Sequence, residues 1–337
     1  MREQFSVANP DAQARQESLE HALFEIKRVI AGQDTMLERV LVCLLADGHL
    51  LIEGVPGLAK TLTIKTTAQV LGGTFNRIQF TPDLMPSDLV GTRVYRPHSG
   101  EFDVDLGPVF CNFLLADEIN RAPAKVQSAL LEVMQERQVT IGKESFAAPS
   151  PFLVMATQNP IESEGTYPLP EAQVDRFMLK VVVGYPEPED ELTVVERTLT
   201  GLAEVRPIIG LDELAALRAA VKDVYVDPAL SRYAVQIAWA TRDAESAGLP
   251  ELKAYVAFGA SPRGPISLMA AARALALIRG RDYVLPLDVR ELARDALQHR
   301  IVLSYEALAA EIGADSIVDS VLEVVQMPEI DLVERAA

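Results

Sequence analysis

The feature that most constrains this chain is residues 54–61, which read Gly-Val-Pro-Gly-Leu-Ala-Lys-Thr. An apolar run, residues 50–52, precedes them, and residues 62–71 are typical of a helix. A glycine-containing turn between a strand and a helix points several backbone N–H groups into one concavity, at the positive end of the helix dipole. Lys60 supplies a mobile cation for the outer phosphates, and Thr61 supplies a hydroxyl for Mg²⁺. The segment therefore predicts a loop that binds a nucleoside triphosphate.

This loop departs from the usual pattern at one position. The pattern G-x-x-x-x-G-K-[ST] has glycine before the lysine, and this chain has Ala59 there. The added methyl group is a small steric change that we expect to be tolerated if φ at Ala59 stays negative.

Two carboxylates at the end of a second strand are expected beside the loop. Residues 113–118 are an apolar run that ends in Asp117 and Glu118. Ligands bind at the carboxyl ends of buried parallel strands. Asp117 is then placed to hold the Mg²⁺ shell on the Thr61 side, and Glu118 to polarise a water as a general base. Two acids at a strand end can also be simply solvated, but their combination with the loop favours a site.

Two further polar residues follow predicted strands. The run 152–157 leads to Asn159, whose amide could orient an attacking water, although Asn-Pro can equally start a turn. Arg176 precedes another apolar strand, residues 178–183. Arginine suits the charge that develops on a transferring phosphoryl group, so Arg176 could act in cis or in trans, or could be an ion-pair partner of Asp175.

These residues together carry a family resemblance over roughly residues 20–330. The chain resembles AAA+ ATPases, and within them the MoxR family. The stretches that carry the resemblance are residues 53–61 (EGVPGLAKT), 80–91 (FTPDLMPSDLVG), 115–127 (LADEINRAPAKVQ), 129–136 (ALLEVMQE), 156–164 (ATQNPIESE) and 165–177 (GTYPLPEAQVDRF). Ala59 is similar to what this family carries, so it does not count against nucleotide binding.

The resemblance implies a role for each matching position. Lys60 and Thr61 match the Walker A lysine and threonine, Asp117 and Glu118 match Walker B, and Asn159 matches sensor 1. Arg176 matches an arginine finger that reaches a neighbouring subunit's nucleotide. Arg263 resembles a sensor 2 arginine, with a plain helix-end arginine as the alternative. The implied nucleotide contacts are Gly32 and Gln33 on the adenine side, the loop residues Gly54, Val55, Pro56, Gly57, Leu58 and Ala59, and Leu62; the implied metal ligands are Thr61 and Asp117.

Composition narrows the class of protein. The length of 337 residues suggests about two domains. A net charge of −17 without a visible basic cluster disfavours a nucleic-acid motor, although a locally basic pore in a ring would remain compatible with it. No apolar run is long enough to span a bilayer, and residues 1–4 do not read as a signal peptide. Cys43 and Cys111 are expected to be buried free thiols, which fits a reducing cytoplasm.

The order of predicted elements divides the chain into four parts. We expect an N-terminal tail over 1–17, an AAA+ P-loop core over 18–184, a linker over 185–190 and an all-helical lid over 191–337. The core should be a three-layer α/β domain with a parallel sheet. A helix is expected over 18–29, and lid helices over 211–221, 229–244, 265–279 and 287–304, with no strand after the linker. Hairpins are expected near 95–102 and 138–146; the resemblance implies that the first is a helix 2 insert, and both could approach substrate or be ordinary surface turns.

The resemblance implies a Mg²⁺-dependent ATPase that forms a homo-oligomeric ring, expected to be a hexamer. Its cofactors would be ATP and Mg²⁺, with Glu118 as base, Lys60 and the metal as charge clamps, and Arg176 supplied by the adjacent protomer. Its clients would be proteins, often with a von Willebrand factor A domain, which it remodels or activates, for example for metal-cofactor insertion or complex maturation. The alternatives are a metal-chelatase motor subunit, a nucleic-acid translocase and a non-catalytic nucleotide-gated scaffold. Neither nucleic acid binding nor membrane insertion is expected.

Overall fold

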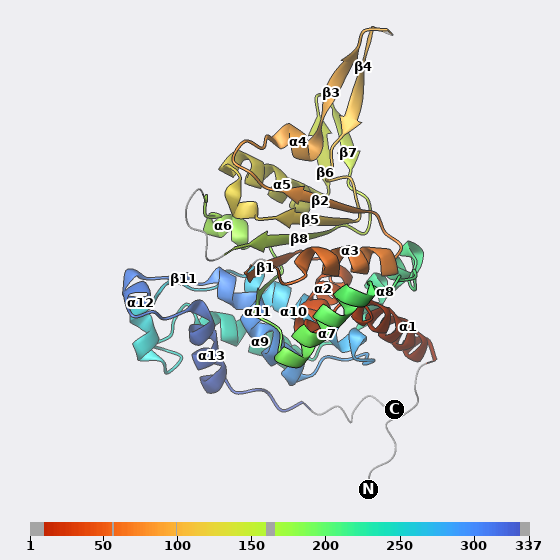
Figure 1. The fold of residues 1–337 in the computed structure, drawn as a ribbon. Helices are drawn as coiled ribbons and strands as arrows, with labels where there is room; N and C mark the ends of the chain where they lie inside the picture. The colour runs from red at the N-terminus through yellow and green to blue at the C-terminus, as the bar shows by residue number, and fades with distance from the viewer. Residues whose placement is uncertain (1–9, 56, 99, 160–165, 331–337) are drawn as a thin grey trace. The chain divides into compact units, whose positions relative to one another are not determined.

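A computed structural model describes residues 10–55, 57–98, 100–159 and 166–330. Its contacts separate two compact units, one of residues 26–211 and one that joins the residues before 26 to residues 212 and beyond. Figure 1 labels their helices and strands. Among the described residues, none of the helices combines the length and the apolar character that crossing a bilayer requires.

The unit of residues 26–211 is built on a parallel sheet, as predicted. Its strands are ordered β2-β5-β8-β1-β9, so neighbours in space are not neighbours in sequence. The strands are β1 (Leu50–Gly54), β2 (Phe75–Gln79), β5 (Phe113–Asp117), β8 (Leu153–Gln158) and β9 (Leu179–Val183). Strands β5, β8 and β1 are almost wholly buried because helices cover both faces of a parallel sheet, which explains their continuous apolar runs.

Helices form the outer layers of this unit. They are α2 (Asp34–Leu45), α3 (Lys60–Val70), α4 (Pro86–Val90), η1 (Ile119–Arg121), α5 (Ala124–Glu136), α6 (Glu171–Val174) and α7 (Pro188–Thr200). Alternate strand residues such as Leu114 and Ala116 form one buried cluster with Leu130 and Met134 of α5. Helices α2 and α3 lie on the opposite side of the sheet from α5 (Figure 1). The core is therefore the three-layer α/β domain that the sequence predicts.

Both predicted hairpins are present. The first pairs β3 (Gly91–Arg96) with β4 (Glu101–Leu106), and the second pairs β6 (Gln138–Ile141) with β7 (Glu144–Ala147). Gly91 closes the base of the first hairpin with φ of 99°, and a Cβ there would lie 2.2 Å from the Asp105 carbonyl oxygen. No side chain larger than hydrogen fits at that approach.

A buried histidine ties the start of β1 to the neighbouring elements. His49 Nδ1 accepts a hydrogen bond from the Val154 N–H (3.0 Å), and its Nε2 lies 3.1 Å from the Met134 carbonyl oxygen. Because the amide can only donate to Nδ1, the proton of the neutral ring is on Nε2 and is donated to that carbonyl. The imidazole is thus a structural link between β8 and the end of α5.

The cysteines behave as predicted. Cys43 and Cys111 are both buried and free. Burial raises the pKa of the Cys111 thiol to about 12. The thiol is therefore protonated at neutral pH and packs as a small apolar group.

The second unit is mainly helical, and it corrects two predictions. Its elements after residue 210 are α8 (Leu211–Asp223), α9 (Pro228–Ala240), η2 (Pro250–Ala254), β10 (Val256–Phe258), α10 (Arg263–Ile278), α11 (Pro286–Leu297), η3 (Gln298–Arg300), β11 (Val302–Leu303), α12 (Tyr305–Ala309) and α13 (Ala314–Val324). A helix over 287–304 was wrong, since α11 ends at Leu297 and the chain continues into β11. The absence of strands was also wrong, because β10 and β11 pair in antiparallel fashion. Ser304 then begins a new helix by accepting the Ala307 N–H (3.1 Å).

Two helix starts also differ from the prediction. Helix α1 (Pro10–Lys27) begins well before residue 18, inside the expected tail. Helix α7 begins at Pro188, inside the expected linker. Proline is favoured in the first helical turn, where its missing N–H is not needed, so it marks a beginning here and not a break. The division of the chain into tail, core, linker and lid stays a prediction.

Candidate functional site

The strand order brings the predicted loop and the predicted acids to one edge of the sheet. Strand β8 lies between β1 and β5, and all three run parallel. The loop after Gly54 and the pair Asp117–Glu118 therefore leave the sheet on either side of the end of β8. The carboxyl ends of parallel strands are where ligands bind in α/β folds.

The loop after β1 has a left-handed backbone at two positions. Gly57 has φ of 89°, with open space around it, and Ala59 has φ of 54° directly before α3. The condition under which the Ala59 methyl group was expected to be tolerated, a negative φ, is therefore not met. The Ala59 carbonyl accepts the Thr63 N–H (2.8 Å), so Ala59 already makes the first hydrogen bond of α3. Its backbone is in the left-handed conformation, which glycine adopts without steric cost. Val55, Leu58, Thr61 and Leu62 lie in the same loop and first turn, and Pro56 lies outside the described residues.

Lys60 is held across the loop. Its Nζ donates to the Gly54 carbonyl oxygen at 2.5 Å. Partial burial lowers the pKa of the Lys60 ammonium, while the negative charges of Asp117, Glu118 and Glu53 act in the opposite direction. The Lys60 ammonium, which was predicted from the loop motif, therefore lies close enough to the Asp117 and Glu118 carboxylates for their charges to affect its pKa.

One hydroxyl that sequence reasoning missed fixes the two acids. Thr157, on β8 and buried, donates to Asp117 Oδ1 (2.6 Å) and accepts the Glu118 N–H (2.9 Å). Glu118 has φ of 55°, in the left-handed region, and directly follows the end of β5. A threonine at the end of a strand gives no signal by itself, because only the register of β5 against β8 shows what its hydroxyl meets.

Strand β2 supplies two more partners that sequence reasoning missed. Arg77 donates to Asp117 Oδ2 from Nε (3.1 Å) and from Nη2 (2.7 Å). Gln79 donates to Glu118 Oε2 (2.9 Å), and Arg121 forms an ion pair with the same oxygen (2.9 Å). The polar alternation of Arg77 and Gln79 on a short strand was the available signal, since it places both side chains on one face.

The remaining predicted residues have different surroundings. Asn159 is buried directly after β8, next to residues 160–165, which lie outside the described ranges. Arg176 is exposed after α6, and its Nη1 donates to the Leu131 carbonyl of α5 (3.1 Å). Arg263 is exposed at the first residue of α10 and belongs to the other unit. Its assignment as a sensor 2 arginine stays a prediction.

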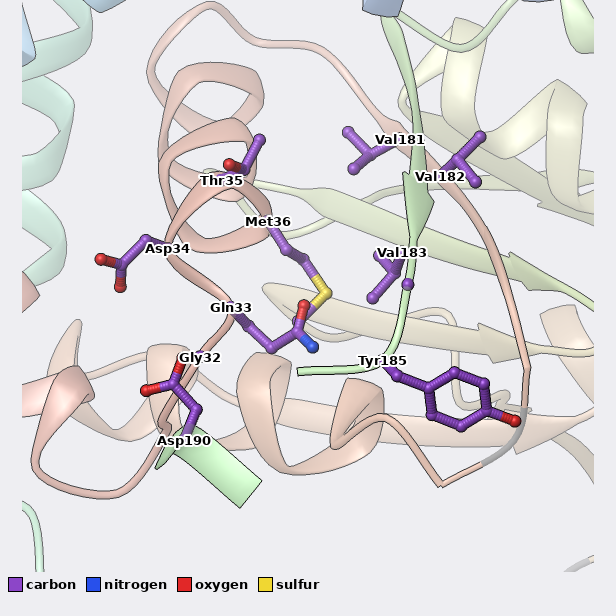
Figure 2. A pocket seen from close by; sticks show the side chains of 11 residues that line it. Gly32, Gln33, Asp34, Thr35, Met36, Val181, Val182, Val183, Tyr185 and Asp190 are labelled. Carbon is purple, nitrogen blue, oxygen red and sulfur yellow. The ribbon is translucent and has the colours of Figure 1, made fainter. Parts of the chain in front are cut away.

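A cavity of about 440 Å³ adjoins the loop. Residues 32–36 with Asp190 form one wall, and residues 181–185 form the other (Figure 2). The second wall lies next to the start of the loop, because Val183 of β9 is paired with Gly54 of β1. Gly32 and Gln33, which were predicted on the adenine side, both line the cavity, whereas Asp190 was missed.

Gly32 is required for two reasons at this wall. Its φ is 68°, and a Cβ would lie 2.7 Å from Asp190 Cβ. Gln33 precedes α2, and both Gln33 and Met36 line the cavity (Figure 2). The cavity lining combines the apolar side chains of Met36 and the β9 valines with polar groups that include the Gln33 amide. This amide can both donate to and accept from a heterocyclic base.

These residues fit a magnesium nucleotide. The loop offers backbone N–H groups and an ammonium, and the cavity beside it can hold a base and sugar. Within the described ranges, no group of three or more His, Cys, Asp or Glu side chains could hold a metal by itself. Mg²⁺ is typically bound by one or two carboxylates together with substrate phosphates, so Thr61 and Asp117 would hold it jointly with a nucleotide.

Comparisons with known proteins agree with this geometry. Residues 49–179 match the model of the ATPase family associated with various cellular activities (AAA), and residues 252–321 match the AAA lid domain. The chain is 56% identical to Chaperone MoxR1 of Mycobacterium tuberculosis over 94% of this chain and 84% of that protein. It is 35% identical to Protein MoxR of Paracoccus denitrificans, over 82% and 86% of the two chains.

A solved structure supports the same assignment. The crystal structure of a candidate ATPase from Cytophaga hutchinsonii superposes with a TM-score of 0.90 at 46% identity, covering 96% of this chain and 98% of that one. The parallel core, the helical second unit and these relatives lead to one conclusion: the chain belongs to the MoxR family of AAA+ ATPases.

Proposed function

We propose that this chain is a Mg²⁺-dependent ATPase whose hydrolysis drives chaperone-like remodelling or activation of partner proteins. The observation that carries the proposal is the convergence of Lys60, Asp117 and Glu118 beyond the ends of β1 and β5, on either side of β8 and beside a cavity of about 440 Å³. The relative named as a chaperone supports the second half of the proposal.

Each residue has a task in this proposal. The loop from Gly54 to Leu62 binds the phosphates, and Gly32 and Gln33 bind the base. Lys60 neutralises phosphate charge, and Thr61 and Asp117 hold the metal, which supplies further charge neutralisation when bound. Glu118 takes a proton from the attacking water, and Asn159 orients that water.

Phosphate release tests the catalytic proposal directly. Purified protein with ATP and Mg²⁺ should release phosphate, and Lys60→Met and Glu118→Gln should each abolish most of it. Excess chelator should do the same. Phosphate release by Glu118→Gln at the wild-type rate would overturn the role of Glu118 as the base.

Ring assembly is the second part of the proposal, with six subunits as the expected number. The exposure of Arg176 is compatible with a task in a neighbouring subunit. Arginine fingers contribute roughly 10³-fold or more to turnover, so Arg176→Ala alone should be almost inactive. Mixing Arg176→Ala with Glu118→Gln subunits should restore turnover, because some interfaces then contain both intact groups. A mixture that stays inactive while both variants assemble would rule out catalysis in trans by Arg176.

Client proteins would meet the ring at the β3–β4 hairpin. This hairpin exposes Tyr95 and Phe102, whose ring centroids are 5.2 Å apart, with Arg93 stacked over Phe102. Exposed aromatic and arginine side chains are enriched in protein-binding surfaces. Pull-down from native cells with the wild type should retain client proteins, including some with a von Willebrand factor A domain, and a Tyr95→Ser/Phe102→Ser variant should lose them. Tyr305→Ser, at an exposed tyrosine of α12, is the matched control.

We place this activity in the cytoplasm and without nucleic acid. A filter-binding titration at two salt concentrations should detect no DNA or RNA complex. Tight binding that falls steeply with salt would indicate a translocase instead.

A further inference from the structure

Both oxygens of the Asp117 carboxylate already have partners. Oδ1 accepts the Thr157 hydroxyl (2.6 Å), and Oδ2 accepts two N–H groups of Arg77 (3.1 and 2.7 Å). Arg77 therefore neutralises the carboxylate that the proposed function assigns to Mg²⁺.

The sheet topology holds Arg77 in this position. Strand β2 is the edge strand next to β5, and its parallel register pairs Gln79 with Asp117. Arg77 lies two residues before Gln79 on the same face of the strand, and its Nη2 also donates to Gln79 Oε1 (2.9 Å). The amide of Gln79 in turn donates to Glu118 (2.9 Å). A network from one edge strand thus reaches both acids of the site.

A guanidinium and Mg²⁺ compete for the same carboxylate. Mg²⁺ is a hard dication that requires close oxygen ligands in near-octahedral geometry, whether bound directly or through its waters. A cation at hydrogen-bond distance from Oδ2 occupies that oxygen and repels the metal. The pair must therefore open, at least in part, when the metal arrives.

We propose that Arg77 is a positioning residue: it binds the Asp117 carboxylate in the metal-free state and releases it when Mg²⁺ binds. The strength of this ion pair then sets the Mg²⁺ concentration at which the nucleotide complex forms. The proposal rests on the proposed function, since it presupposes that a magnesium nucleotide binds here. The side chain of Arg77 is 47% exposed, so the released guanidinium can move into water. Pairs exposed to this degree contribute up to about 1 kcal/mol, which corresponds to about a fivefold change in an equilibrium.

The test measures Mg²⁺ binding and not turnover. A fluorescent ATP analogue is bound to the full chain in chelator, Mg²⁺ is titrated in, and the midpoint of the fluorescence change is recorded. Arg77→Gln removes the charge and leaves a shorter, neutral polar side chain, so its midpoint should fall by about threefold to fivefold. Arg77→Lys keeps a point charge without the two-pronged contact, so its midpoint should fall by less.

A matched control exists in the other unit. Arg294 also contacts an aspartate, Asp319, through Nε and Nη2, and its side chain is 49% exposed. Arg294→Gln should leave the midpoint unchanged. Circular dichroism and thermal unfolding of each variant check the fold, and if Arg77→Gln fails to fold, the smaller shift in Arg77→Lys decides the matter.

The outcomes separate the two levels of the proposal. A lowered midpoint in the Arg77 variants alone supports the role of Arg77. Normal analogue binding with an unchanged or raised midpoint overturns that role and leaves the proposed function intact. Failure of the wild-type chain to bind the analogue, with or without Mg²⁺, overturns the proposed function and this inference with it.

Discussion

Replacing Ala59 with glycine should stabilise the protein, although glycine usually destabilises. Ala59 has φ of 54° and ψ of 17°, at the residue that leads into α3. The left-handed conformation costs an alanine about 1–2 kcal/mol, because its Cβ crowds the backbone carbonyl. Glycine removes this cost but increases the conformational entropy of the unfolded chain, which offsets about 0.4–1 kcal/mol. The expected net gain in the free energy of unfolding is about 0.5–1 kcal/mol.

Thermal unfolding without nucleotide measures this gain. For a unit of the size of residues 26–211, 1 kcal/mol shifts Tm by about 2–4 °C, so Ala59→Gly should raise Tm by about 1–4 °C. Ala46→Gly is the matched control, because Ala46 also caps a helix but has φ of −84°. That variant should lose stability by about 0.4–1 kcal/mol. If Ala59→Gly lowers Tm as Ala46→Gly does, the left-handed backbone at Ala59 is refuted.

Three further predictions concern the cavity wall, the buried histidine and the buried thiol. Gly32→Ala should lose about 2 kcal/mol or more in urea unfolding and weaken nucleotide binding, because its φ is 68° and the added Cβ would lie 2.7 Å from Asp190 Cβ; Gly184→Ala, on the opposite wall with open space around it, should stay within about 0.5 kcal/mol, and equal losses would contradict the predicted strain at Gly32. His49→Ala should lose about 2–4 kcal/mol in the same assay, because two buried backbone groups lose their partner; a loss of well under that range would show that water replaces the ring. The pKa of the Cys111 thiol is near its ordinary value of 9.0 in the unfolded chain and is raised to about 12 in the folded chain. The contribution of the protonated thiol to the free energy of unfolding is therefore complete below pH 9 and is lost as the pH rises toward 12. Urea unfolding at pH 8, 9.5 and 11 should therefore show a shallower fall for Cys111→Ala, and parallel curves would count against the raised pKa.

Local pattern was enough to predict several elements of the core unit. The loop after β1 was found because its chemistry lies in consecutive residues. The buried strands were found because helices on both faces demand unbroken apolar runs, and the hairpins because their turns carry glycine. Element ends were less well predicted: α7 starts at Pro188, where a proline that reads as a breaker is a helix start.

Contacts between strands that are distant in sequence could be decided only by the tertiary structure. The order β2-β5-β8-β1-β9 places Arg77 and Thr157 on either side of Asp117, although these residues lie far apart along the chain. The amino-acid sequence by itself determined which side chains are predicted to bind a magnesium nucleotide. The register of parallel strands decided which partners hold them, because a one-residue slip would turn each side chain to the other face of the sheet.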